Sequence, residues 1–205
     1  MESLARGGTR WKRFAVVMVP SVAATAAIGV ALSQGALAAS FSVSGQQFKV
    51  TADRLDGQGF VQYGAIDSTK AGKKPVAVVG FSTAQIRSLC QSVVVPVPAF
   101  GDVTMKLSAG GAGGPKVEAK KLYIDADDIS ADATFKNVDI GVSVDDTTKG
   151  PGPSKGDKYL PGSFAQQAET ATFKDVKQRA WATTAGTFKL SGLKMAVKKG
   201  KNECY

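Results

Sequence analysis

The side chain best suited to covalent chemistry is Ser82, within the run Gly80-Phe81-Ser82-Thr83-Ala84. This run approximates the G-x-S-x-G nucleophile elbow, in which a strand turns into a helix and presents the serine. The chain contains no histidine, so a Ser-His-Asp triad would have no general base. The sequence therefore leans against an enzyme and leaves Ser82 as a weak catalytic candidate. Capping of a short helix by Ser82 and Gln85 is the simpler interpretation.

An acidic cluster over residues 125–132 is the second candidate site. Calcium prefers carboxylate oxygens, and alternation along a strand would put Asp125 and Asp127 on one outer face. The EF-hand pattern is absent, because Ser130 stands at its sixth position and Lys136 at its twelfth. Asp125 and Asp127 are therefore weak metal candidates beside the simpler interpretation of a solvated strand face. Zinc spacings and phosphate-binding loops are also missing, so no cofactor is predicted.

Aromatic side chains supply the third candidate site. Phe60, Tyr63, Phe81 and Trp181 would line a groove for an acyl chain or isoprenoid, with an ordinary hydrophobic core as the alternative. Basic and aromatic residues do not interleave as they do in sites for single-stranded nucleic acid. The expected partner is therefore a lipid or another apolar small molecule, and nucleic acid is not expected.

Residues 1–38 are predicted to be a secretory signal peptide. Basic side chains precede the apolar run 14–32, and Ala36-Leu37-Ala38-Ala39 follows it with an A-x-A cleavage pattern. The alternative is an uncleaved membrane anchor through residues 14–32. Both interpretations place residues 39–205 outside the cytoplasm, as a single secreted domain.

Export makes a disulfide between Cys90 and Cys204 plausible, with two free thiols as the alternative. The chain carries 26 basic and 17 acidic residues, of which four and one lie in the first 38. The remainder therefore holds 22 basic and 16 acidic residues, a net charge of +6. Such a surface favours contact with an anionic cell envelope, and solubility is the simpler interpretation.

The elements that position these residues are predicted to be antiparallel strands. Apolar and polar residues alternate over 48–53, 122–127 and 188–191, which is typical of half-buried strands. The segment 145–162, rich in Gly, Pro, Lys and Asp, is a functional or disordered loop. A short helix is expected over 84–91, because the pattern at Ser82 and Gln85 resembles a capping box. The fold class is therefore all-β, a curved antiparallel sheet or β-sandwich with one short helix.

Several segments are similar to a family of actinobacterial secreted proteins of unknown function, some of which carry the label "cholesterol esterase". The resemblance covers most of the chain after the export segment. It is carried by that segment and by residues 59–64, 89–92, 178–180, 187–193 and the terminal Glu203-Cys204. The label implies a serine hydrolase, and the family offers no catalytic residues to carry over.

The sequence thus favours a secreted or envelope-associated, non-catalytic protein that binds a lipid or another apolar ligand. One alternative is a hydrolase of lipid or sterol esters acting through Ser82. A second alternative is a structural or interaction protein at the cell surface.

Overall fold

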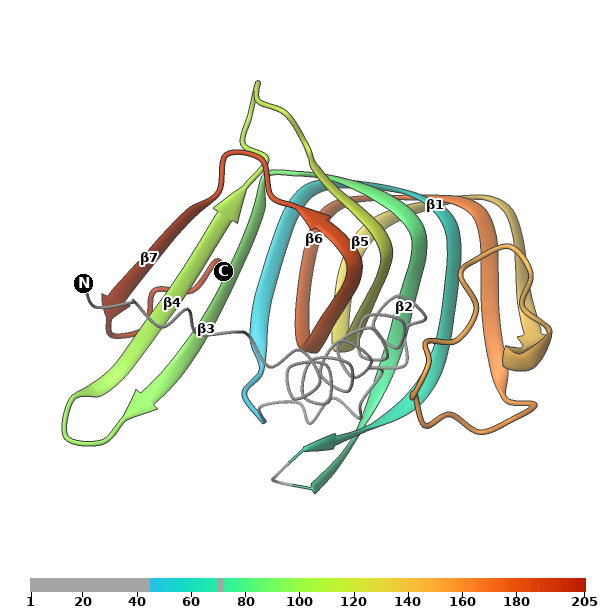
Figure 1. The fold of residues 1–205 in the computed structure, drawn as a ribbon, viewed down its shortest axis with the longest axis horizontal. Helices are drawn as coiled ribbons and strands as arrows, with labels where there is room; N and C mark the ends of the chain where they lie inside the picture. The colour runs from blue at the N-terminus through green and yellow to red at the C-terminus, as the bar shows by residue number, and fades with distance from the viewer. Residues whose placement is uncertain (1–44, 70–71) are drawn as a thin grey trace, which may run out of the picture. The chain divides into compact units, whose positions relative to one another are not determined.

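The computed structural model describes residues 45–69 and 72–205 (Figure 1). The predicted signal peptide or anchor lies outside these residues and stays a prediction. Within the described ranges, no helix has both the length and the apolar character needed to cross a membrane.

The described residues form one antiparallel sheet of seven strands, which confirms the all-β prediction. The strands are β1 (Phe48–Thr69), β2 (Gly72–Arg87), β3 (Leu89–Val97), β4 (Gly101–Ala109), β5 (Val117–Ser143), β6 (Phe164–Lys189) and β7 (Lys194–Lys199). β5 has 27 residues, β6 has 26 and β1 has 22, whereas strands of about 5–6 residues are usual. Twist accumulates along strands of this length, and the sheet curls round on itself (Figure 1).

Four of these strands close into a ring. The sheet order is β2-β5-β6-β1-β3-β4-β7, and β2 also pairs with β1. β6 meets β1 over residues 48–52. Two side-chain hydrogen bonds continue the same antiparallel register along β1: Thr172 Oγ1 to Asp56 Oδ1 at 3.0 Å, and Gln166 Nε2 to Gln62 Oε1. We call β1, β2, β5 and β6 the ring.

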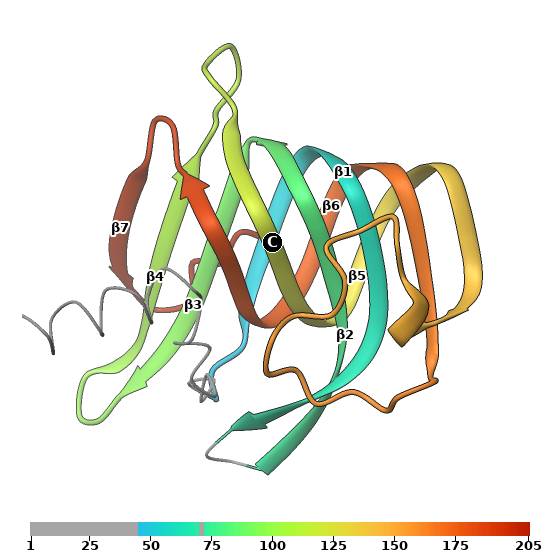
Figure 2. The same ribbon diagram turned by 45° about the vertical axis from the view of Figure 1, so that its right-hand side comes forward.

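The remaining strands, β3, β4 and β7, extend from the ring as an open sheet, which we call the wing (Figures 1 and 2). β3 pairs with β1 over residues 48–51, β4 pairs with β3, and β7 forms the outer edge on β4. Ser88, with φ of 53°, separates β2 from β3. Before Ser88 the chain forms β2 and pairs with β5, and after Ser88 it forms β3 and pairs with β4.

The predicted short helix is wrong. Residues 84–91 lie in β2 and β3, and β2 has a hydrogen-bonded neighbour on each side. Ser82 and Gln85 therefore stand in mid-strand, where there is no helix to cap. Within the part of the chain that the structure describes, helical structure is limited to the 3₁₀ turn Val144–Asp146. Pairing on both sides of β2 outweighs a weak local capping signal.

The ring interior holds the main hydrophobic core. Phe60, Phe81, Phe135 and Phe173 come from β1, β2, β5 and β6, with ring centroids 5.0 to 6.0 Å apart in their contacts. The absence of a side chain at Gly57 of β1 leaves room for this cluster, because a Cβ atom there would lie 2.2 Å from Phe81 Cδ1. Each strand of the ring thus contributes one aromatic side chain to a shared centre.

Residues 144–163, which we call the strap, lie against the outer face of β1. Val61 and Tyr63 belong to a second, smaller core beneath the strap, together with Val144. The Ile66 N–H donates to the Lys158 carbonyl at 2.9 Å and fixes the strap to β1. The predicted loop over residues 145–162 is therefore a packed cover.

The C-terminal tail crosses one face of the wing and is held there covalently. Cys90 and Cys204 form the disulfide that the sequence predicts. The Cys204 N–H donates to Ser92 Oγ at 3.0 Å, and the Asn202 N–H donates to Thr104 Oγ1 at 2.9 Å. Ser92 and Thr104 are buried by this contact, so the opposite face of the wing stays free of the tail.

Candidate ligand-binding cavity

A cavity of about 210 Å³ opens inside the ring. Its walls are almost entirely apolar and come from all four ring strands: Leu55, Val79, Phe81, Ile124, Ile129, Phe173 and Val176. Ala133 also lines the cavity and is exposed, so it marks the rim where the cavity meets solvent. Apolar cavities of about 150 Å³ bind molecules the size of benzene. This cavity therefore admits an apolar ring or a segment of an acyl chain.

Two amide side chains interrupt the apolar wall. Gln62 lines the cavity from β1, and its Oε1 accepts a hydrogen bond from Gln166 Nε2. Gln178 lines it from β6 and is 6% exposed. An apolar pocket with a few fixed polar groups is the usual form of a small-molecule site, because the polar groups set the orientation of the ligand.

A second cavity of about 30 Å³ lies next to the first, on the side of the wing. Leu55, Val176 and Gln178 line both cavities. Leu89 and Gln91 of β3 line only the smaller one. The two cavities therefore lie on either side of shared side chains, and the smaller one reaches the first residues of the wing.

The structure divides the four predicted groove residues into two pairs. Phe81 lines the cavity, and Phe60 packs behind it with ring centroids 5.6 Å apart. Tyr63 and Trp181 belong instead to the smaller core under the strap. Phe60 and Tyr63 are three residues apart on one strand, so they face opposite sides of it.

The backbone at Gly59 changes which side chains of β1 face the core of the ring, and the sequence does not show this change. Its φ of +62° lies in the left-handed region that favours glycine. Before it Leu55 faces the core of the ring, and after it Phe60 does so, so the alternation of β1 changes phase at this point. The two amides of the cavity also escaped the sequence analysis. Gln178 alternates with Val176 and Ala180, which are core residues. This place in the alternation could have identified Gln178 as an inward-facing amide.

Ser82 lies on the outer side of β2, away from the cavity. A Cβ atom on Gly59 would come within 2.5 Å of Ser82 Oγ and 3.0 Å of the Lys149 carbonyl oxygen. Ser82 therefore packs against Gly59 close to the strap. Phe81, its neighbour in sequence, faces the cavity instead.

Asp125 and Asp127 lie in different surroundings. Asp127 Oδ1 accepts a hydrogen bond from Arg179 Nε at 2.8 Å. Burial raises the pKa of Asp125 to about 7, and the nearby charges of Asp67 and Asp157 add to this shift. Within the described ranges, no group of three or more metal-ligating side chains is placed to hold an ion.

The buried acids lie next to the tyrosines of the strap core. Tyr63 Oη donates to Asp157 Oδ2 and accepts from the Ser154 N–H at 3.0 Å. Burial raises the pKa of Asp157, against a lowering by the Tyr63 hydrogen bond, and burial also raises the pKa of Asp67. Asp67 Oδ2 is buried with no hydrogen-bond partner among the described residues. The burial of these carboxyl groups therefore favours their protonated forms, most strongly at Asp125.

The fold and the cavity define an antiparallel β-domain that is closed on itself around a largely apolar internal cavity. Residues 44–205 match the model of a family described as a family of unknown function, DUF6230, and the chain belongs to that family. No curated protein and no solved structure matches the chain.

Proposed function

We propose that this domain is a non-catalytic binding protein for an apolar, lipid-like ligand held inside the ring. The observation that carries the proposal is the cavity of about 210 Å³ with an apolar wall and two amides. Leu55, Val79 and Phe173 would contact the apolar part of the ligand. Gln62 and Gln178 would bind a hydroxyl, ester or carboxyl group, because an amide can both donate and accept hydrogen bonds.

The size of the cavity narrows the class of ligand. Sites for drug-sized molecules measure about 300–1,000 Å³, and this cavity is smaller. A single acyl segment or a small ring system fits its present volume better than a whole sterol ester. The resemblance to actinobacterial proteins labelled "cholesterol esterase" supports a ligand of the lipid or sterol class. Hydrolysis is not part of the proposal, because Ser82 lies outside the cavity and the chain has no histidine.

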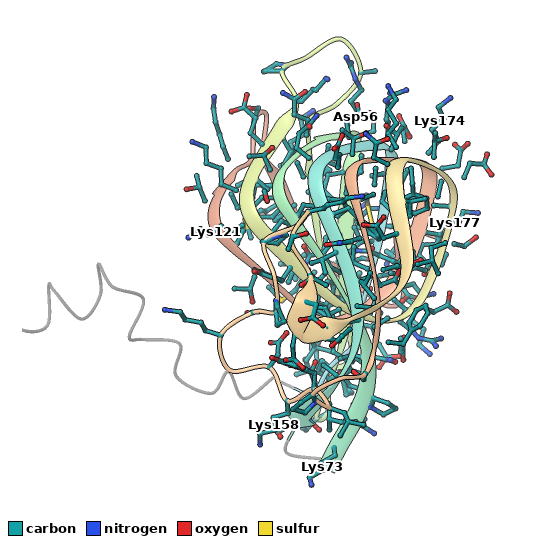
Figure 3. All side chains as sticks on the ribbon, turned by 90° about the vertical axis from the view of Figure 1, so that its right-hand side faces the viewer. Asp56, Lys73, Lys121, Lys158, Lys174 and Lys177 are labelled. Atoms are coloured by element: carbon teal, nitrogen blue, oxygen red, sulfur yellow. A yellow bond between two sulfur atoms is a disulfide. The ribbon has the colours of Figure 1, made fainter. Side chains whose placement is uncertain are left out.

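We place this function outside the cytoplasm. The export pattern of residues 1–38 supports that location, and the disulfide is typical of proteins in oxidising compartments. Lysines project from the ring and from the strap, among them Lys73, Lys121 and Lys174 of the ring and Lys158 of the strap (Figure 3). A surface of this kind suits contact with an anionic envelope.

The test is native mass spectrometry of the protein recovered from its own culture. We expect a dissociable mass of lipid size on the wild-type protein. Ala131→Phe places a ring in the cavity and should abolish that mass. Thr134→Phe adds the same ring at an exposed position of β5 and should leave the mass in place.

Melting temperatures of both variants show whether they fold. A wild-type protein that carries no lipid, and takes none up from a fatty-acid or sterol mixture, would refute the proposal. Retention of the ligand by a folded Ala131→Phe variant would place the site elsewhere.

A further inference from the structure

One face of the wing presents apolar side chains to solvent. The strand ladders place Val93, Met105 and Val197 side by side across β3, β4 and β7, with Leu107 beside Met195 in the adjacent row. Met195 and Val197 are each 68% exposed, and Met105 is 45% exposed. Single exposed apolar residues are common, but a contiguous group of them is typical of an interaction site.

This apolar face is the side that the C-terminal tail leaves open. Ser92 and Thr104 hold the tail and point to its side of the wing. Because side chains alternate along a strand, Val93 and Met105 point to the opposite side. We call this side, defined by Val93, Met105, Leu107, Met195 and Val197, the apolar face of the wing.

The wing is basic, and its lysines are divided between the two faces: Lys106, Lys194 and Lys198 share the tail side with Ser92, Ser108 and Thr104, whereas Lys199 shares the apolar face. Residues 89–109 and 191–201 contain one acidic residue, Asp102, and five lysines: Lys106, Lys194, Lys198, Lys199 and Lys201. Asp102 Oδ2 lies 3.8 Å from Lys201 Nζ. Lys199 stands opposite Val103 in the ladder, and its Nζ lies 4.9 Å from the ring centroid of Phe100, which is 56% exposed.

We propose that the apolar face of the wing docks on an anionic lipid surface. Met105, Met195 and Val197 would enter the boundary between headgroups and acyl chains, and Lys199 would contact the phosphates. An apolar surface with a lysine and an exposed aromatic side chain at its margin, on a basic wing, has the composition of elements that lie in a membrane interface. The inference does not rest on the proposed function, because this face exists whether or not the cavity holds a ligand.

A second copy of the chain is the competing occupant. Pairing of two sheets through their edges would join two β7 strands, and β7 carries Lys194, Lys198 and Lys199. Lysines on an edge strand repel a like-charged partner and oppose such pairing. Lys199 on the apolar face attracts anionic headgroups and the other two lysines add to the positive field of the edge, so the charge of the edge favours the lipid surface.

The experiment uses the full chain and two kinds of vesicle, one of phosphatidylcholine alone and one of phosphatidylcholine with phosphatidylglycerol. Sedimentation measures binding. Oxidation of Met105 and Met195 by dilute peroxide reports whether the apolar face is covered. We expect oxidation of both methionines to slow several-fold with the anionic vesicles, and binding to neutral vesicles to be about ten-fold weaker.

Matched variants locate the contact. Met195→Asp should weaken binding to anionic vesicles about ten-fold, whereas Ile140→Asp, on β5 and equally exposed at 68%, should have no effect. Lys199→Glu should weaken binding, and Lys198→Glu, which changes the neighbouring residue on the tail side, should do so less. All variants keep residues 1–44, so differences between them report on the wing.

Unchanged oxidation of Met105 and Met195 in the presence of vesicles would overturn the inference. So would equal binding by the wild type and a folded Met195→Asp variant. Light scattering that shows a dimer dissociated by Met195→Asp would assign the face to a second copy instead. The ligand mass in the cavity is measured separately and should survive Met195→Asp, so failure of this inference and failure of the proposed function remain distinct.

Discussion

Buried carboxyl groups under the strap tie the stability of this domain to pH. Asp125 is the clearest case, because burial, together with the nearby charges of Asp67 and Asp157, raises its pKa to about 7. The folded-state pKa therefore exceeds the ordinary value of 3.8, and the folded state binds the proton more tightly. The stability contributed by this group is complete at low pH and is lost as the pH rises from about 4 to about 7.

Replacement of Asp125 by asparagine removes this dependence. At pH 8 the Asp125→Asn variant should be more stable than the wild type by about 1–2 kcal/mol, because a buried charge beside two other carboxylates is gone. At pH 5 the difference should shrink, since Asp125 is then mostly protonated. Urea unfolding of the variant and the wild type at pH 8 and at pH 5 measures the two differences in unfolding free energy. Asp127→Asn, which removes an ion pair with Arg179, is the control and should not stabilise the protein at pH 8.

Gly57 is a second residue whose role can be tested directly. A Cβ atom there would lie 2.2 Å from Phe81 Cδ1, and Phe81 is fixed by contacts with Phe60 and Phe173. Gly57→Ala should therefore cost about 1–3 kcal/mol of unfolding free energy through overpacking. It should also weaken ligand retention, because Phe81 would be pushed toward the cavity.

Gly64 provides the matched control on the same strand. A Cβ atom at Gly64 meets nothing within 4 Å, so Gly64→Ala should leave stability within about 0.5 kcal/mol of the wild type. Equal effects of the two substitutions in thermal unfolding would show that backbone flexibility, rather than contact with Phe81, determines the cost at Gly57.

The individual strands were predictable to the extent that their alternation is regular. Val50 and Ala52 of β1, and Leu122, Ile124 and Ala126 of β5, are core residues as the pattern predicts. The phase change at Gly59 could not be foreseen, because it depends on a backbone conformation that the sequence permits without requiring. It places Phe60 beside Phe81 in the core of the ring and Tyr63 in the strap core. Trp181 of β6 also packs against the strap core. The sequence therefore assigned to one groove four aromatic residues that the structure divides between two cores.

The sequence similarity between two segments has a structural counterpart. Residues 133–138 resemble residues 171–176, and the first three residues of each segment face one another in the β5–β6 ladder. Thr134 stands opposite Thr172, Phe135 opposite Ala171, and Ala133 opposite Phe173. Similar sequences thus meet in antiparallel register and give the core one phenylalanine from each strand. The pairing could not be read from spacing alone, because spacing does not show which strands are neighbours.

Closure of the ring is the feature of the whole molecule that creates the site. Neither a flat sheet nor a sandwich of short strands would enclose the cavity, and closure depends on long-range pairing such as β1 with β2. Gln91, which lines the smaller cavity, stands opposite Leu107 of the apolar face of the wing. The regions that the binding proposal and the docking proposal involve are therefore neighbours in the fold.

The ring and the wing should differ in how they lose structure. The ring closes through four interlocked ladders, whereas the wing joins β1 through the four residue pairs of β1 and β3. The disulfide between Cys90 and Cys204, 114 residues apart, fastens the tail across that junction. In the chain-entropy model a loop of this length contributes about 4–5 kcal/mol. Reduction, or replacement of both cysteines by serine, should lower the unfolding free energy by up to about this amount.

Loss of the disulfide should destabilise the wing before it destabilises the ring. Hydrogen exchange should speed up first at β3, β4 and β7, because their hold on the ring is weakest, and later at β5 and β6, which pair along most of their length. Lys49→Ala, which removes the salt bridge to Glu203 of the tail at 3.1 Å and keeps the disulfide, is the control and should change exchange only slightly. Uniform acceleration across ring and wing after reduction would show that the two unfold as one unit.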